Sequence, residues 1–323
     1  MRRGVKISFW TILLAVAVVW VAIRWQAWFG MPVEPQWTGD TIVYPMPSLN
    51  AENAEESLLY EVDSALTLLV LGDIHNGLTC ADYDTLAARV PDVDVVVQTG
   101  DWLERGQFYY LQALLHEWVP SALCDVPVVA CPGNHEYTKG WQKTLSPIWE
   151  EAFPHPHNGP VGVPGAHFYI DLPRLRLIAI DTNPLVRLTH LTRTLTWLSD
   201  LKNTAGERFV VVIMHHPVIS AGKGRCNPLI YAAFRHALGR ADLVLAGHDH
   251  SYMRRAPFVV VNTAGKPKTQ RNGLIADVTD SVSTYSVMTV VQTADTLQPS
   301  GLFFKTYRLC DGQQIDSLYV CHH

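Results

Sequence analysis

The stretch Val95-Val96-Val97-Gln98-Thr99-Gly100-Asp101 determines how the rest of the sequence is interpreted. Its consecutive valines are β-branched and apolar, which favours a buried strand. Gly100 lets the backbone turn sharply where this strand ends, so that the carboxylate of Asp101 leaves the sheet at its edge. A single Asp after a strand also fits the cap of a following helix. The other apolar runs of the chain argue against a cap alone.

Four further apolar runs end in side chains that bind metal ions. In chain order, these side chains belong to Asp73-Ile74-His75 after Leu68–Gly72, Asn134-His135-Glu136 after Val128–Gly133, His215-His216-Pro217 after Phe209–Met214, and His248-Asp249-His250 after Leu243–Gly247. The carboxyl ends of strands in an α/β sheet converge on one edge, where sites are built. In the first and last of these groups, the two outer side chains can turn to the same side of an extended segment and bind one ion.

The donor atoms in these groups are carboxylate oxygens, one amide oxygen and imidazole nitrogens, without a thiolate. This set suits Mn, Fe or Zn rather than a soft metal. Asp101 stands between histidine-containing groups, and a single carboxylate can bridge two ions about 3.5–4 Å apart. Each tripeptide is common by itself. The groups taken together, each after an apolar run, indicate one site for two metal ions of unknown identity.

The order Asp-x-His, Gly-Asp, Gly-Asn-His-Glu, His and Gly-His-x-His resembles the calcineurin-like metallophosphoesterase superfamily, from about Leu66 to Lys268. The resemblance implies that one ion is held by Asp73, His75 and His250, that the other is held by Asn134, His215 and His248, and that Asp101 bridges the two. It also implies that His135 faces the substrate and does not bind metal. His216 and Glu136 are expected to adjoin the ligands.

Some flanking residues are closest to the purple-acid-phosphatase-like and class III phosphodiesterase-like members. These are Ala179-Ile180-Asp181-Thr182, Met214-His215-His216-Pro217 and Gly247–Tyr252. Two residues depart from the purple acid phosphatase pattern. Glu104 occupies the position where those enzymes have a Tyr, and His75 stands where their first motif has a Gly. An iron–tyrosinate site is therefore not expected.

The resemblance implies an α/β fold, a four-layer α-β-β-α sandwich of two mixed β-sheets flanked by helices. Alternation of strands with helix-like segments supports βαβ units. The expected helices are Ala81–Val90, Gln107–Val119, Gly140–Phe153, Leu191–Leu201 and Leu229–Leu238. The expected later strands are Phe258–Asn262, Tyr285–Val291, Leu302–Leu309 and Ile315–Val320. These strands of 258–323 are predicted to complete the second sheet.

The N-terminus predicts a membrane anchor. Arg2, Arg3 and Lys6 precede an uncharged, mostly apolar run from Ile7 to Ile23, which ends at Arg24 with tryptophans close behind. This length is near the lower limit for a membrane span, and a cleaved signal sequence followed by secretion is the alternative. The charge bias places the N-terminus inside and the catalytic domain outside the cytoplasm, in a periplasmic or extracellular position. The predicted parts are a basic cytoplasmic tip at 1–6, a single-pass transmembrane anchor or signal sequence at 7–29, a linker at 30–64 and the metallophosphoesterase domain at 65–323.

Composition limits the partners of this chain. Its 323 residues are 48% hydrophobic and carry a formal net charge of −5. This mild acidity gives no electrostatic footprint for nucleic acid, so no nucleic-acid partner is expected. Six cysteines permit disulfides in an exported domain, but their spacing does not specify a pairing.

The sequence thus predicts a membrane-anchored hydrolase of phosphate monoesters or diesters. Two metal ions can acidify a bridging water, and the resulting hydroxide attacks phosphorus while His135 serves the leaving group. One alternative is a pyrophosphatase that acts on a lipid-linked or nucleotide-sugar substrate, which an anchor at the bilayer favours. Another is a non-catalytic metal-binding protein. The sequence does not name the substrate.

Overall fold

The computed structural model describes residues 65–104, 112–138, 144–172, 174–186, 188–221, 232–268, 276–291 and 301–321. The predicted basic tip (1–6), anchor (7–29) and linker (30–64) lie outside these residues. Among the described residues, no helix has both the length and the apolar character that a membrane span requires.

The first sheet has six strands in the order β13-β12-β11-β1-β2-β3. Its strands are β1 (Ala65–Leu71), β2 (Val95–Gln98), β3 (Val128–Ala130), β11 (Thr284–Val291), β12 (Gly301–Arg308) and β13 (Gln314–Val320). The first three are parallel, and β11 joins β1 antiparallel. The three valines of β2 are all buried, as a strand covered on both faces requires.

The second sheet has seven strands in the order β10-β8-β9-β7-β6-β5-β4. Its strands are β4 (Phe168–Leu172), β5 (Leu175–Ile180), β6 (Phe209–Met214), β7 (Leu243–Ala246), β8 (Tyr252–Arg255), β9 (Phe258–Val260) and β10 (Val278–Asp280). Strands β5, β6, β7 and β9 form a parallel run, and antiparallel pairs add β4 at one edge and β8 and β10 at the other. The prediction of two mixed sheets is confirmed.

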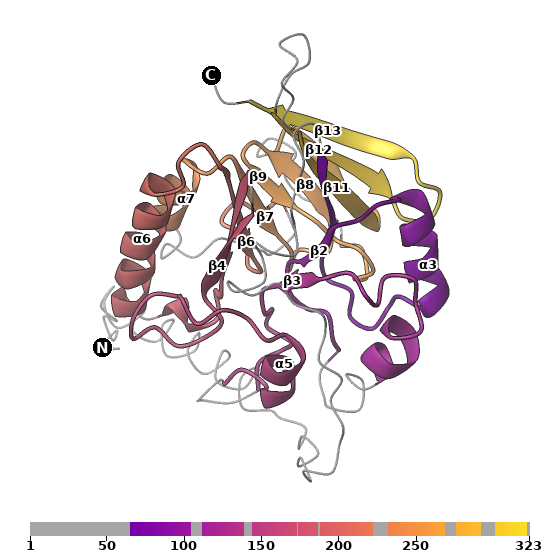
Figure 1. The fold of residues 1–323 in the computed structure, drawn as a ribbon, viewed down its shortest axis with the longest axis horizontal. Coiled ribbons are helices and arrows are strands. Elements are labelled where there is room, and N and C mark those ends of the chain that lie inside the picture. The colour runs from indigo at the N-terminus through magenta and orange to yellow at the C-terminus, as the bar shows by residue number, and fades with distance from the viewer. Residues whose placement is uncertain are drawn as a thin grey trace, which may run out of the picture.

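The sheets pack face to face, with helices on their outer faces (Figure 1). Side chains such as Val97, Val211 and Phe304 fill the space between the sheets. Three helices pack on the first sheet: α3 (Cys80–Arg89), a π-helix η1 (Gln112–Trp118) and α5 (Pro147–Ala152). On the second sheet lie α6 (Leu188–Asn203) and α7 (Ala232–Leu238), at the left edge of Figure 1. A 3₁₀ turn, η2 (Pro184–Val186), precedes α6.

Some helix bounds differ from those predicted. Of the segment expected to be helical over 140–153, residues 144–146 are not helical, the α-helix runs over Pro147–Ala152, and Ser146 before it is extended. A residue before proline is disfavoured in the helical region, which explains the late start. Within 107–119, the described part is a π-helix over Gln112–Trp118 rather than an α-helix. Residues 105–111, 139–143 and 222–231, which belong to or adjoin predicted helices, lie outside the described residues.

The last strands do not all join the sheet that was predicted for them. Strands β8, β9 and β10 belong to the second sheet, but β11, β12 and β13 extend the first. The reason lies at β1, which pairs with β2 on one side and would otherwise expose its other edge. Strand β11 pairs with that edge from Ala65 to Val70, which satisfies its backbone groups. Apolar alternation identified these strands but could not identify their partner.

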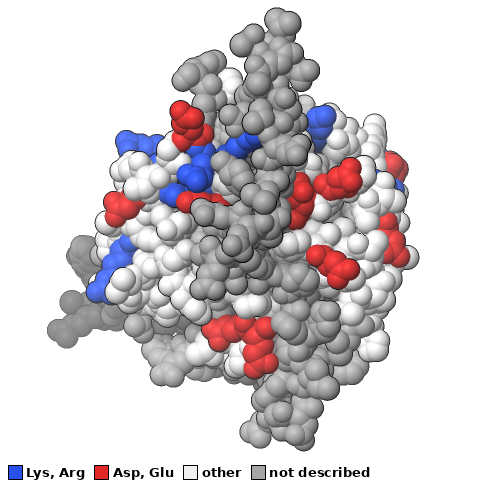
Figure 2. Space-filling model, viewed as in Figure 1, with Lys and Arg blue, Asp and Glu red and all other residues white. Residues whose placement is uncertain are grey.

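The surface seen from the same side carries charges of both signs. In Figure 2, Lys and Arg side chains gather at the upper left, while Asp and Glu side chains lie beside them and over the right and lower parts. The expectation that the protein has no nucleic-acid partner remains a prediction from the sequence.

Candidate metal centre

Strands of both sheets end at one edge of the sandwich, where the predicted ligands gather. The ligands follow successive strands: Asp73 and His75 after β1, Asp101 after β2, Asn134 after β3, His215 after β6, and His248 and His250 after β7. The two sheets are joined here, because the backbone N–H of Thr263 donates to the carbonyl oxygen of Gly72 over 2.7 Å. Residues that are far apart in sequence thus share one small volume.

The backbone at this edge adopts conformations that side chains usually avoid. Several of the predicted ligands have positive φ angles: Asp73 at 51°, His75 at 49°, Asp101 at 56°, His248 at 73° and His250 at 52°. Each such conformation costs on the order of 1–3 kcal/mol, and residues of this kind cluster at functional sites. Glycine permits the close packing of the loops, since a Cβ on Gly133 would lie 2.2 Å from Oδ1 of Asp101.

Asp101 lies at the centre of the site and is almost completely buried. Its Oδ2 lies 3.2 Å from Nε2 of His215 and 3.7 Å from Nε2 of His75. Its Oδ1 accepts the backbone N–H of His135 over 2.8 Å. One oxygen therefore faces two histidines from different sheets, which is the position that a bridging ligand requires.

One cluster consists of Asp73, His75, Asp101 and His250, whose donor atoms lie within 4.8 Å of one another. Nδ1 of His250 lies 3.2 Å from the carbonyl oxygen of Lys266. A carbonyl only accepts, so this nitrogen carries the proton and Nε2 presents a lone pair. That Nε2 is 3.0 Å from Nε2 of His75, and Oδ2 of Asp73 is buried without a hydrogen-bond partner. These atoms fit a divalent cation.

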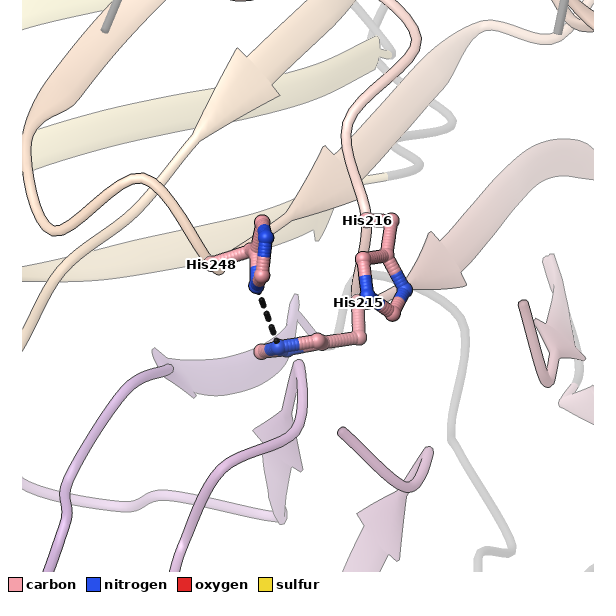
Figure 3. Close-up of side chains that lie close together, drawn as sticks. All are labelled: His215, His216 and His248. Atoms are coloured by element: carbon pink, nitrogen blue, oxygen red, sulfur yellow. Dashed lines mark hydrogen bonds between the residues drawn. The ribbon is translucent and has the colours of Figure 1, made fainter. Parts of the chain in front are cut away.

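A second cluster surrounds His215, whose Nδ1 lies 3.0 Å from the carbonyl oxygen of Thr99. By the same argument Nδ1 carries the proton, and in the neutral ring Nε2 is a lone pair. Nε2 lies 3.2 Å from both Oδ1 of Asn134 and Nδ1 of His248. Figure 3 shows His248 and His215 approaching each other, with His216 beside them. This convergence of electron-pair donors also fits a cation.

Burial and mutual charge shift the titration of these groups. Burial raises the pKa of Asp73 to about 7 and lowers the pKa of His75 to about 4. Burial also lowers the pKa of His215, but the charge of Asp101 outweighs it and the pKa rises to about 9. Conversely, burial raises the pKa of Asp101, but His215 holds it well below its usual range. His75 is thus neutral near pH 7, whereas His215 carries a proton that it would have to lose to bind a metal ion.

Glu136 adjoins the predicted ligands and supports the loops that carry them. Its buried carboxylate accepts the backbone N–H groups of Gly133 at 2.7 Å, Asp101 at 2.9 Å and Leu103 at 3.2 Å. It therefore ties the loop after β2 to the loop after β3. Both loops carry predicted ligands, so Glu136 fixes the distance between them.

His135 and Glu104 lie on the more open side of the site. Nε2 of His135 is 3.9 Å from Oδ2 of Asp101, and its Nδ1 is 3.6 Å from Oε2 of Glu104. The other oxygen of Glu104 is 3.7 Å from Nδ1 of His75. The side chains of His135 and Glu104 are 20% and 53% exposed, so both can meet a substrate. In the sequence, Glu104 stands out only as a departure from tyrosine. Its position three residues after Asp101 is the one sequence feature that indicates a place at the site.

The segment after β5 was not predicted to contribute to the site. Asp181 is buried and accepts the backbone N–H of Ala166, the hydroxyl of Tyr137 and the backbone N–H of Asn183. The side-chain amide of Asn183 donates to the carbonyl oxygen of Gly133 over 3.2 Å. The segment thus braces the backbone next to Asn134. Its only sequence signal was the Asp-Thr pair after an apolar strand.

Comparison with known proteins places the chain in a family. Residues 66–252, more than half of the chain, match the calcineurin-like phosphoesterase family. The chain belongs to this family. No functionally curated protein matches the sequence.

Two solved structures share the fold. GAP50, the anchor in the inner membrane complex of Plasmodium, has a TM-score of 0.57 and 14% identity, covering 80% of this chain and 89% of that chain. Purple acid phosphatase PPD1 from yellow lupin (Lupinus luteus) seeds has a TM-score of 0.56 and 15% identity, covering 80% of this chain and 54% of the lupin chain. This chain therefore spans about half the length of the lupin enzyme. At these identities the similarity shows the fold alone.

Proposed function

We propose that the chain is a metal-dependent phosphoesterase that uses two ions to hydrolyse phosphate monoesters or diesters. The observation that carries this proposal is the position of Asp101. Its Oδ2 lies near His75 of one cluster and 3.2 Å from His215 of the other. The first cluster also contains a buried oxygen without a hydrogen-bond donor, Oδ2 of Asp73.

The residues would divide the chemistry between them. Asp73, His75 and His250 would hold one ion, Asn134, His215 and His248 the other, and Asp101 both. When bound, the ions would acidify a water and neutralise charge on the phosphoryl oxygens. His135 would hold a proton at Nε2 for the leaving oxygen. Oε2 of Glu104 lies 3.6 Å from Nδ1 of the same ring.

Two finer proposals rest on the sequence outside the described residues. The first is that residues 7–29 anchor the protein in a membrane, with the catalytic domain outside the cytoplasm. The second is an alternative to ester hydrolysis, in which the substrate is a lipid-linked or nucleotide-sugar pyrophosphate, because an anchored domain meets amphiphilic molecules. The alternative of a non-catalytic binding protein is disfavoured by the complete set of ligand side chains at the site.

Hydrolysis of two chromogenic esters tests the proposal. The full-length chain, purified in detergent, is treated with a chelator and then supplied with Mn, Zn or Fe. Hydrolysis of p-nitrophenyl phosphate is compared with that of bis-p-nitrophenyl phosphate, and Asp101→Asn serves as the control. Metal-restored turnover that the variant lacks supports the proposal, and the better substrate distinguishes monoesterase from diesterase. An absence of turnover with every metal, while two ions bind, contradicts hydrolysis of simple esters.

A further inference from the structure

His216 and Thr182 form a pair beside the second cluster that the metal assignment does not use. His216 follows β6, and Thr182 follows β5, the neighbouring strand of the same sheet. The hydroxyl oxygen of Thr182 lies 2.6 Å from Nδ1 of His216. The same oxygen accepts the backbone N–H of His216 over 3.3 Å. A single hydroxyl therefore fixes both the backbone and the ring of this histidine.

This pairing specifies what His216 can do. The Thr182 oxygen accepts the backbone N–H of His216 and lies 2.6 Å from Nδ1, and we assign its hydroxyl hydrogen to this nitrogen. Nδ1 then acts as an acceptor, and the ring proton sits on Nε2. A ring nitrogen that carries a proton donates a hydrogen bond and does not bind a metal ion.

The ring lies where such a donor meets a ligand of the cluster. Its centroid is 4.4 Å from that of His248 and 5.0 Å from that of His215. One ring nitrogen from each of the three residues falls within 4.8 Å of the others, and Figure 3 shows the rings side by side. His215 is completely buried, whereas His216 is only half-buried. His216 is therefore more accessible to solvent than its neighbour His215.

We propose that His216 binds a non-bridging phosphoryl oxygen of the substrate through Nε2–H, and that Thr182 is the positioning residue that holds this ring. The inference rests on the proposed function, because it assumes that a phosphoryl group occupies the site. It assigns His216 to the substrate rather than to the metal. It also gives the segment after β5 a role in substrate binding.

Phosphate binding and metal content test this assignment without requiring turnover. Inorganic phosphate is titrated into the full-length, Mn-loaded chain by calorimetry, and bound Mn is counted. In His216→Ala we expect unchanged Mn content and about 10- to 100-fold weaker phosphate binding, since a hydrogen bond to a charged group is lost. Thr182→Val should weaken binding several-fold in the same direction, while Thr182→Ser, which keeps the hydroxyl, should restore it. His236→Ala, on the exposed side of α7, is the matched control and should change neither quantity.

The outcomes separate this inference from the proposed function. Loss of Mn in His216→Ala would show that the residue is a metal ligand and would overturn the inference. Unchanged phosphate affinity at full Mn content would also overturn it, even if the wild-type chain hydrolyses esters. Weaker phosphate binding in the variant of a chain that lacks turnover would support the inference while contradicting the proposed function. A wild-type chain that binds no phosphate would overturn both.

Discussion

Asp73 and Glu136 are two buried carboxylates of the same site with different surroundings. Burial raises the pKa of each to about 7. The oxygens of Glu136 accept three backbone N–H groups at 2.7 to 3.2 Å. Asp73 accepts one, from His248 at 2.9 Å, and its Oδ2 has no hydrogen-bond partner.

The number of hydrogen-bond donors separates a carboxylate that is saturated by the backbone from one that keeps an unpaired oxygen. A buried acceptor without a donor is costly, on the order of 1–3 kcal/mol, and each such group requires an explanation. At Asp73 a bound cation would supply the missing partner. At Glu136 the backbone already supplies the donors, so no ion is needed. Asp181 resembles Glu136 in this respect, because its oxygens accept hydrogen bonds from Tyr137, Ala166 and Asn183.

The largest expected effect is that of Asp73→Asn on metal binding. The amide removes the negative charge that faces the cation, and we expect metal affinity to fall by more than ~100-fold, beyond the usual loss for an outer partner. The metal-free protein should be no less stable than wild type, because the buried charge is gone. Metal titration and thermal unfolding in a chelator provide the two measurements. A drop in stability without loss of metal would contradict the comparison.

Proton competition is expected to change metal affinity by a smaller but still large factor. Asp73 and His215 have pKa values of about 7 and about 9 in the metal-free protein, so both release protons when metal binds. Metal affinity should therefore rise with pH, by at least ~10-fold between pH 6 and pH 8. The rise should be shallower in Asp73→Asn, which has one proton fewer to release. Calorimetric metal titrations at several pH values measure both slopes, and equal slopes would contradict this role for Asp73.

Compared with Asp73→Asn, Glu136→Gln should reduce the stability of the fold more and the metal affinity less. The glutamine retains one acceptor oxygen but turns an amide group toward backbone donors, so we expect a loss of about 1–3 kcal/mol in the free energy of unfolding. Metal affinity should fall only ~10-fold, through displacement of the loop that carries Asp101. Denaturant unfolding of the metal-free chain measures the first quantity. If the metal-free stability is unchanged while metal is lost, Glu136 is a ligand.

Much of this site was predictable because its chemistry follows strand ends. An apolar run that stops at Gly-Asp or Gly-His already shows where a sheet edge carries donor atoms, as for Asp101 and His248. The surroundings of each donor were not predictable. Sequence cannot show that Glu136 meets three N–H groups or that Thr182 contacts His216 on the adjacent strand end, since these contacts depend on how separate loops pack. For the same reason the prediction that β11, β12 and β13 join the second sheet is wrong.

The smallest expected effect concerns Asp181, which is saturated like Glu136 but lies one contact further from the ligands. Its influence on Asn134 passes through Asn183, whose amide donates to the carbonyl oxygen of Gly133. Asp181→Asn should therefore lower metal affinity less than ~10-fold, the lower end for an outer partner. It should still destabilise the fold, because Tyr137 and the backbone of Ala166 lose a charged acceptor. Metal titration beside Asn183→Ala, which cuts the same path at the next residue, tests the route. If the losses in metal affinity add up in the double variant, the two residues act separately. If they act through one path, the double variant should lose little more affinity than either single variant.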